Sequence, residues 1–138
     1  MTSLLSRATG PYWDALVVRL IAAAPLIGVG LAHVFKPGQG MLPLAQALGL
    51  PGAEILAPIA VAIEIIAGLL FLLGGWVRLG ALLAIPVMLV AFYAHLVVTV
   101  WPAPNAPPFA LPLVILACAG WLLWRGAGRL SLDARASR

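Results

Sequence analysis

Residues 79–124, LGALLAIPVMLVAFYAHLVVTVWPAPNAPPFALPLVILACAGWLLW, contain no Lys, Arg, Asp or Glu. At 1.5 Å per residue, about 20 apolar residues cross a bilayer core of about 30 Å, so this stretch is long enough for two crossings. Prolines at 102, 104, 107 and 108 interrupt it, because proline ends helices. The stretch therefore predicts two transmembrane helices, residues 79–101 and 109–124, joined by a tight extracytoplasmic turn.

Two further apolar stretches, residues 15–35 and 54–74, also have the length of a membrane-spanning helix. The chain is 64% hydrophobic and only 9% charged, whereas roughly a quarter of the residues of a soluble domain are charged. Such a chain cannot cover itself with polar side chains. We therefore predict an all-α integral membrane protein, a four-helix bundle that forms a single domain over residues 1–138.

Basic residues near the ends of the predicted helices fall on one side of the membrane, and Lys36 alone falls on the other. Because cytoplasmic flanks are enriched in Lys and Arg, this asymmetry predicts that both termini are cytoplasmic. The tryptophans agree, since indole rings favour the interfaces and only Trp101 lies at an outer helix end. The residues assigned to the cytoplasmic side are Arg7, Arg78, Arg125, Arg129, Arg135 and Arg138, with Trp13, Trp76, Trp121 and Trp124.

The net charge of +4 does not indicate a nucleic-acid partner. The basic C-terminal tail, residues 125–138, directly follows an apolar helix, where anchoring at the cytoplasmic surface explains its arginines. The lipid bilayer is therefore the first predicted partner, and self-association of the chain is left open. The single Cys118 excludes an internal disulfide and a paired-cysteine redox motif.

The connection between the first two helices, residues 36–53, combines leucines with glycines. It predicts a short helix that lies on or dips into the extracytoplasmic interface. Pro25 and Pro86 lie in the middle of the first and third helices, where a proline removes a backbone hydrogen bond. They predict kinks in these two helices.

Glu64 is the polar residue of the predicted spans whose placement inside a membrane most needs an explanation. A charged side chain near the bilayer centre costs about 2.5–3.5 kcal/mol on insertion scales, so such groups face the protein interior. The face of the helix that carries Glu64 also carries Ala57, Ala60, Ala67 and Gly68, small residues on which another helix packs closely. We predict that Glu64 points into the bundle as a catalytic, proton-relaying carboxyl, with a purely structural packing role as the alternative.

His95, toward the outer end of the third helix, is the predicted catalytic partner of Glu64. Side chains lean toward the N-terminus of their own helix, so Glu64 and His95 on antiparallel helices lean toward each other. A carboxyl and an imidazole in contact couple their protonation, which suits chemistry that moves protons together with electrons. The alternative is a hydrogen bond between His95 and a backbone carbonyl.

Arg19 and His33 lie on one face of the first helix and are the predicted substrate-binding residues. Arg19, near the cytoplasmic end, either snorkels to the inner interface or forms a buried ion pair with Glu64. His33, close to Lys36 at the outer end, is either an interfacial residue or part of the site.

The sequence resembles the DoxX family of small four-helix bacterial membrane proteins along nearly its whole length. The resemblance implies a place in the bacterial inner membrane as a partner of redox enzymes, since one member is a subunit of a thiosulfate:quinone oxidoreductase. It extends to the charged positions Arg19, Glu64 and Arg78, and to Arg129 and Asp133 of the tail, whereas His95 has no counterpart. The matching features are Arg19-Leu20, Gly30-Leu31-Ala32-His33 with Lys36, Leu48-Gly49-Leu50-Pro51, Glu64 with Gly68, Leu73-Gly74, Arg78, and Gly126-Ala127-Gly128-Arg129-Leu130-Ser131-Leu132-Asp133.

Two functions are compatible with these residues. In the first, the bundle holds a quinone in its outer half, and Glu64 with His95 relays protons within a larger oxidoreductase complex. In the second, the chain is a non-catalytic anchor or assembly subunit whose basic tail, residues 125–138, docks soluble redox proteins or anionic lipid. A third reading, ranked below both, makes His33 and His95 axial ligands of a haem.

Overall fold

The computed structural model describes residues 13–98, 108–128 and 130–136 as helices and short connections. Arg7, Trp101, Arg129, Arg138 and most of the proline-rich turn lie outside the described residues. Within them the chain is helical, without a strand. The elements are α2 (Asp14–Phe35), η1 (Pro37–Gln39), α3 (Met41–Ala47), α4 (Ala53–Leu73), α5 (Val77–Val97), α6 (Ala110–Arg125) and α7 (Leu132–Ala136).

Helices α2, α4 and α5 are long and apolar enough to cross a membrane. They confirm three of the predicted spans to within four residues at each end. Helix α6 is also apolar but has 16 residues, or about 24 Å at the α-helical rise, so a fourth crossing stays a prediction. Helices α2 and α5 continue through Pro25 and Pro86, and the kinks stay predictions. The chain is a helical membrane protein.

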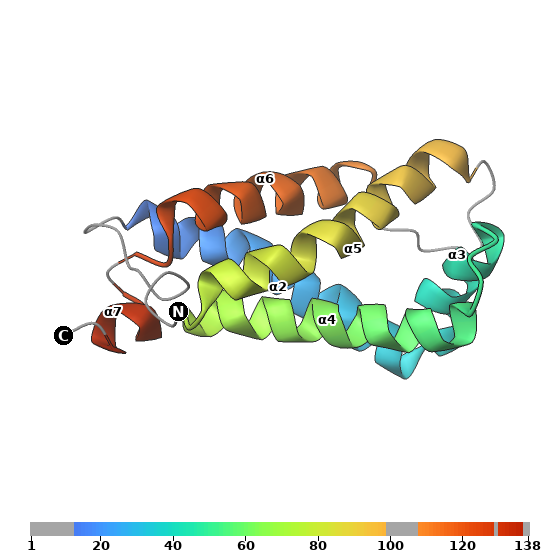
Figure 1. Ribbon diagram of the computed structural model, residues 1–138, viewed down its shortest axis with the longest axis horizontal. Coiled ribbons are helices and arrows are strands. Elements are labelled where there is room, and N and C mark those ends of the chain that lie inside the picture. Colours follow the sequence, from blue (N-terminus) through green and yellow to red (C-terminus); the bar gives the residue numbers. More distant parts are fainter. Residues whose placement is uncertain (1–12, 99–107, 129, 137–138) are drawn as a thin grey trace.

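The four longer helices lie side by side (Figure 1). Helix α2 contacts α4 and α6, and α5 contacts the same two helices, so each helix packs on two others. Their shared core contains many alanines, which allow close approach, and Phe71 is its largest fully buried side chain. Outward-facing positions carry large apolar side chains such as Val17, Ile21 and Leu89. Apolar residues that are exposed along spanning helices contact the lipid of a bilayer.

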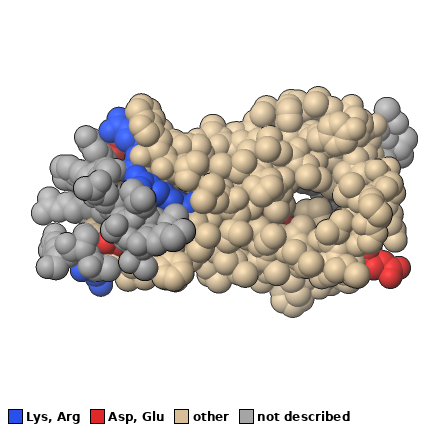
Figure 2. Space-filling model, in the orientation of Figure 1, with Lys and Arg blue, Asp and Glu red and all other residues tan. Residues whose placement is uncertain are grey.

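The two ends of the bundle differ. Helix α3 packs on α4 at one end, whereas α7 lies at the opposite end, next to the start of α5 (Figure 1). On the face shown in Figure 2, Lys and Arg gather at the α7 end, and the long middle of the molecule carries almost no charge. The predicted short helix between the first two spans is confirmed as α3, and its position at the extracytoplasmic interface stays a prediction.

Helices α2 and α4 approach each other through glycine. A Cβ added at Gly68 of α4 would lie 2.7 Å from Ile27 Cγ1 and 3.2 Å from the Ile27 backbone nitrogen of α2. The backbone of a packed helix cannot yield to such a contact unless the whole helix shifts. Within the small-residue face predicted around Glu64, Gly68 is therefore a position on which α2 packs.

We expect Gly68→Ala to lower the thermal stability of the detergent-solubilised protein. The added methyl group overpacks the α2–α4 contact, and overpacking costs about 1–3 kcal/mol. Gly28→Ala is the matched control, because in the described part of the chain no atom lies within 4 Å of its added Cβ, and alanine is the better helix former. Thermal unfolding of both variants measures the difference, and equal melting temperatures would contradict the close approach of the two helices.

Candidate functional site

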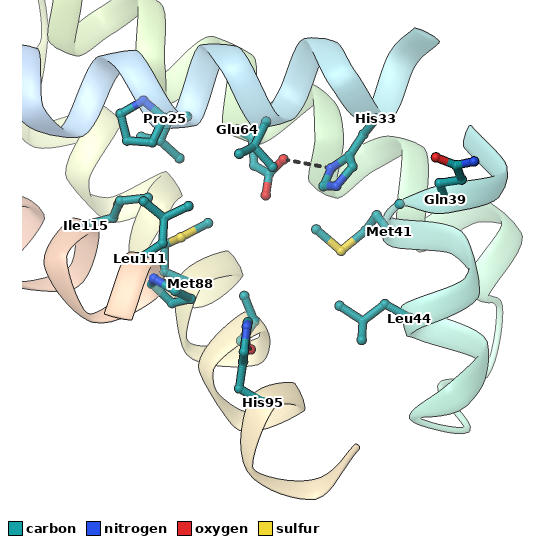
Figure 3. Close-up of a pocket in the computed structure, with 15 residues that line it drawn as sticks. Pro25, His33, Gln39, Met41, Leu44, Glu64, Met88, His95, Leu111 and Ile115 are labelled. Carbon is teal, nitrogen blue, oxygen red and sulfur yellow. Dashed lines mark hydrogen bonds and ion pairs between the residues drawn. The ribbon is translucent and has the colours of Figure 1, made fainter. Parts of the chain in front are cut away.

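Glu64 lies in the interior of the bundle, with 3% of its side chain exposed. This confirms the predicted direction of its side chain. Its partner is His33 of α2, whose Nδ1 lies 3.4 Å from Glu64 Oε2 (Figure 3). The contact has the distance of an ion pair but not the alignment of a hydrogen bond, and neither of these buried atoms has a hydrogen-bond partner among the described residues. Two strongly polar atoms thus lie close together without a hydrogen bond between them.

The Glu64 cavity, a space of about 70 Å³, lies beside this pair. Its walls come from α2, α3, α4, α5 and α6, and most of them are apolar. Figure 3 shows Met41 and Leu44 of α3 facing Met88 and His95 of α5 across the space. Figure 2 shows a hollow between the middle of the molecule and the α3 end, with acidic atoms on its wall. A carboxyl and two imidazoles therefore face one largely apolar cavity.

His95 lies on the α5 wall of the Glu64 cavity. Its Nδ1 lies 2.8 Å from the Ala91 carbonyl oxygen, one turn earlier in the same helix, which is the backbone contact that the sequence left open as an alternative. The edge of its ring meets Phe109 at a centroid distance of 6.0 Å. The structure thus gives Glu64 a different partner from the predicted one, and it keeps His95 within the same cavity.

Gly40, at the start of α3, lies directly against the His33 ring. A Cβ at Gly40 would meet Cδ2 of His33 and would lie 2.9 Å from its Cγ and 3.2 Å from its Nε2. Only a residue without a side chain lets α3 begin against this imidazole. Gly40 belongs to the connection of leucines and glycines at residues 36–53, and nothing in the sequence indicates its contact with His33.

Arg19 lies at the other end of the bundle, away from the Glu64 cavity, and its side chain is buried, with 2% exposed. Neither of the two predicted arrangements is present, because the guanidinium neither reaches the surface nor pairs with Glu64. Instead it donates to four backbone carbonyl oxygens. These are Phe71 at 2.8 Å and Leu72 at 3.1 Å in the last turn of α4, and Ala127 at 3.0 Å and Leu130 at 2.7 Å in the tail.

These carbonyls explain why a cation is buried there. The last carbonyls of an α-helix have no partner within it and carry the negative end of the helix dipole. Arg19 supplies that partner for α4 from a neighbouring helix. Gly74 makes the approach possible, because its φ of +68° ends α4 and a Cβ at this position would lie 2.6 Å from Arg19 Cζ.

The described part of the C-terminal tail is folded onto the same end of the bundle. Asp133 is buried, and its Oδ1 accepts a hydrogen bond of 2.8 Å from the Trp76 N–H at the start of α5. Its own N–H donates to the Gly74 carbonyl at 3.1 Å. A carboxylate at a helix N-terminus interacts favourably with the helix dipole. The described tail residues are therefore part of the fold, with Asp133 and Arg19 joining helices α2, α4 and α5 to the tail.

The sequence of the chain matches one known protein family. The DoxX family model matches residues 15–99, a span that contains Arg19, His33, Glu64 and His95. Helix α6 and the tail lie beyond this match, so the resemblance of residues 126–133 is not part of it. No curated protein and no solved structure matches the chain. Because the family match covers more than half of the chain, the protein belongs to the DoxX family.

Proposed function

We propose that the chain is a membrane subunit of a quinone-linked oxidoreductase complex, with the Glu64 cavity as the binding site for a quinone or a similar lipophilic redox molecule. The supporting observation is the buried pair of Glu64 Oε2 and His33 Nδ1, which lacks hydrogen-bond partners at the wall of an apolar cavity. In this proposal the protein lies in the bacterial inner membrane with both termini in the cytoplasm, and its redox partners are other proteins.

The chemistry of the pair suits this class of ligand. A buried polar atom without a partner costs about 1–3 kcal/mol, so a ligand that satisfies it gains affinity. A carboxyl and an imidazole each donate or accept according to protonation, so they fit the carbonyl of a quinone and the hydroxyl of a quinol alike. A bound quinone supplies two-electron, two-proton redox chemistry. Glu64 and His33 would orient its polar end and hold or release a proton.

The size of the cavity limits how a quinone ring could be held. A cavity of about 150 Å³ accommodates benzene, and each water molecule takes about 30 Å³ in the liquid. The space of about 70 Å³ beside Glu64 is thus sufficient for water but too small for a ring. A ring must therefore also occupy the opening between α3 and α5, with its polar edge toward Glu64. Apolar residues such as Met41, Leu44 and Met88 line that opening.

The two other readings have less support from these contacts. The anchoring role requires a tail that is free to dock, whereas Asp133 and the Leu130 carbonyl are bound to the bundle. The haem reading requires room for a porphyrin between His33 and His95, and a porphyrin exceeds the space of about 70 Å³ by far more than a single quinone ring does.

Binding of a short-chain ubiquinone analogue tests the proposal. We expect Glu64→Gln and His33→Phe to weaken binding about tenfold or more, because the first removes the ionisable, charge-assisted partner and the second removes both ring nitrogens. His95→Ala should weaken it less, since His95 Nδ1 already contacts Ala91. Equilibrium dialysis of the purified protein in lipid nanodiscs provides the measurement. Asp14→Asn is the control, because Asp14 is exposed and lies outside the cavity lining. Wild-type affinity in Glu64→Gln would remove the site.

A further inference from the structure

A second space lies on the other side of His33. It is a groove of about 490 Å³ between the end of α2, the start of α3 and the first turns of α4. We call it the α3 groove; its lining includes His33, Pro37, Met41, Glu54, Pro58 and Ile65. Glu54 is exposed in the first turn of α4, so the groove meets the surface near an acidic side chain.

We infer that His33 is the proton relay between the α3 groove and Glu64, so that the buried carboxyl exchanges protons with water at the α3 end of the bundle. His33 and Met41 are the two residues that line both spaces. A thioether carries no exchangeable proton, so His33 alone of these two can pass one. The proposal deepens the proposed function, on which it rests for its biological use, by naming the route by which the redox site would exchange protons.

The geometry at His33 supports a relay. Nδ1 of its ring lies 3.4 Å from Glu64 Oε2 and leaves Nε2 as a second site for a proton. An imidazole can accept a proton at one nitrogen while it releases one from the other, and its ordinary titration range is close to neutral pH. The side chain is 16% exposed, whereas Glu64 is 3% exposed. His33 is therefore the more accessible member of the pair, and it stands between Glu64 and the groove.

The titratable and charged groups around His33 come from α4, from α5 and from the residue that follows α2, whereas the lining residues of η1, α3 and α6 carry none. Glu64 of α4 faces it inside the cavity, and His95 of α5 lines the same cavity. Glu54 of α4 lines the groove, and Lys36 follows α2 directly and is exposed. His33 thus has one carboxyl group in the cavity and another in the groove.

Gly40 constrains the position of the His33 ring, on which the proposed relay depends. Because a Cβ at Gly40 would lie 2.9 Å from His33 Cγ, alanine there forces the ring to move while both proton-carrying groups remain chemically intact. Gly38, two residues before Gly40, provides a matched control, since no atom of the described residues lies within 4 Å of its added Cβ. Gly40 is thus a positioning residue for the relay.

A pH jump followed by infrared spectroscopy tests the relay without any quinone. The Glu64 signal is the carboxyl or carboxylate band that is lost in Glu64→Gln, and its rate of change after a jump between about pH 5 and pH 9 measures proton exchange, whatever the resting state. We expect His33→Phe, which keeps a ring of similar size, to slow this rate about tenfold or more. Gly40→Ala should slow it to a smaller extent, and Gly38→Ala should match the wild type.

An unchanged rate in His33→Phe would overturn the relay, as would a Glu64 signal that does not respond to external pH. If His33→Phe fails to fold, Gly40→Ala alone decides, because wild-type exchange in that variant contradicts the proposed route. The result is separable from quinone binding. Slow exchange in His33→Phe together with no ubiquinone affinity in the wild type would retain the relay and reject the proposed ligand.

Discussion

Replacing Arg19 by Met is expected to remove most of the folded protein. The substitution keeps an unbranched apolar stem but removes the guanidinium, and so leaves four carbonyl oxygens without their donor. A buried acceptor without a partner costs about 1–3 kcal/mol, so the two buried bonds, to Phe71 and Ala127, alone account for about 2–6 kcal/mol. Folded proteins are stable by only about 5–15 kcal/mol, so this loss removes a large part of the total.

The yield of monodisperse protein in mild detergent measures the effect directly. The single, half-buried Cys118 adds a second readout, because its reaction with a fluorogenic maleimide accelerates when the core opens. Arg19→Lys should be intermediate, since an ammonium is a point charge and cannot span four acceptors. Arg135→Met is the matched control, because Arg135 is exposed on α7. Equal stability of Arg19→Met and Arg135→Met would show that the four hydrogen bonds contribute little.

Deleting residues 126–138 is expected to destabilise the bundle about as strongly. The deletion removes the Ala127 and Leu130 carbonyls, which are two of the four acceptors of Arg19. It also removes the Asp133 carboxylate from the Trp76 N–H at the start of α5. A buried guanidinium that loses half of its acceptors is left partly unpaired, which is costly in a medium of low dielectric.

Two further experiments in the same Cys118 labelling assay separate the contribution of the Asp133 carboxylate from that of the whole tail. Asp133→Ala removes only the carboxylate and should cost about 1–2 kcal/mol, as the loss of a helix N-terminal cap does. A synthetic peptide of residues 126–138, added to the truncated chain, should restore part of the protection of Cys118. A truncated protein as stable as the full chain would mean that the tail contacts are dispensable.

The same contacts change how the anchoring role must be tested. Truncation of the tail would test docking by a free tail, but here it also removes contacts of Arg19 and of the start of α5. A charge reversal at an exposed position, Arg135→Glu, tests docking with the fold intact. Loss of a soluble partner in Arg135→Glu, with normal Cys118 protection, would support an anchoring role.

Several features were determined by the sequence alone. The positions of α2, α4 and α5 follow from apolar runs within single segments, and the burial of Glu64 follows from the cost of a charge in lipid. Both are local properties, because each depends only on one segment of the chain and on the medium around it. The sequence also named His33, Glu64 and His95, the three ionisable residues that share the cavity.

The tertiary structure alone decided which of these residues meet. The choice of His33 over His95 as the partner of Glu64 depends on how far α2 and α4 approach, and glycine contacts between separate helices set that distance. The position of Arg19 depends on a tail more than 100 residues away in the chain, which folds back to supply two carbonyl oxygens. Backbone carbonyls leave no mark in a sequence, because every residue has one, so only packing shows which of them need a donor.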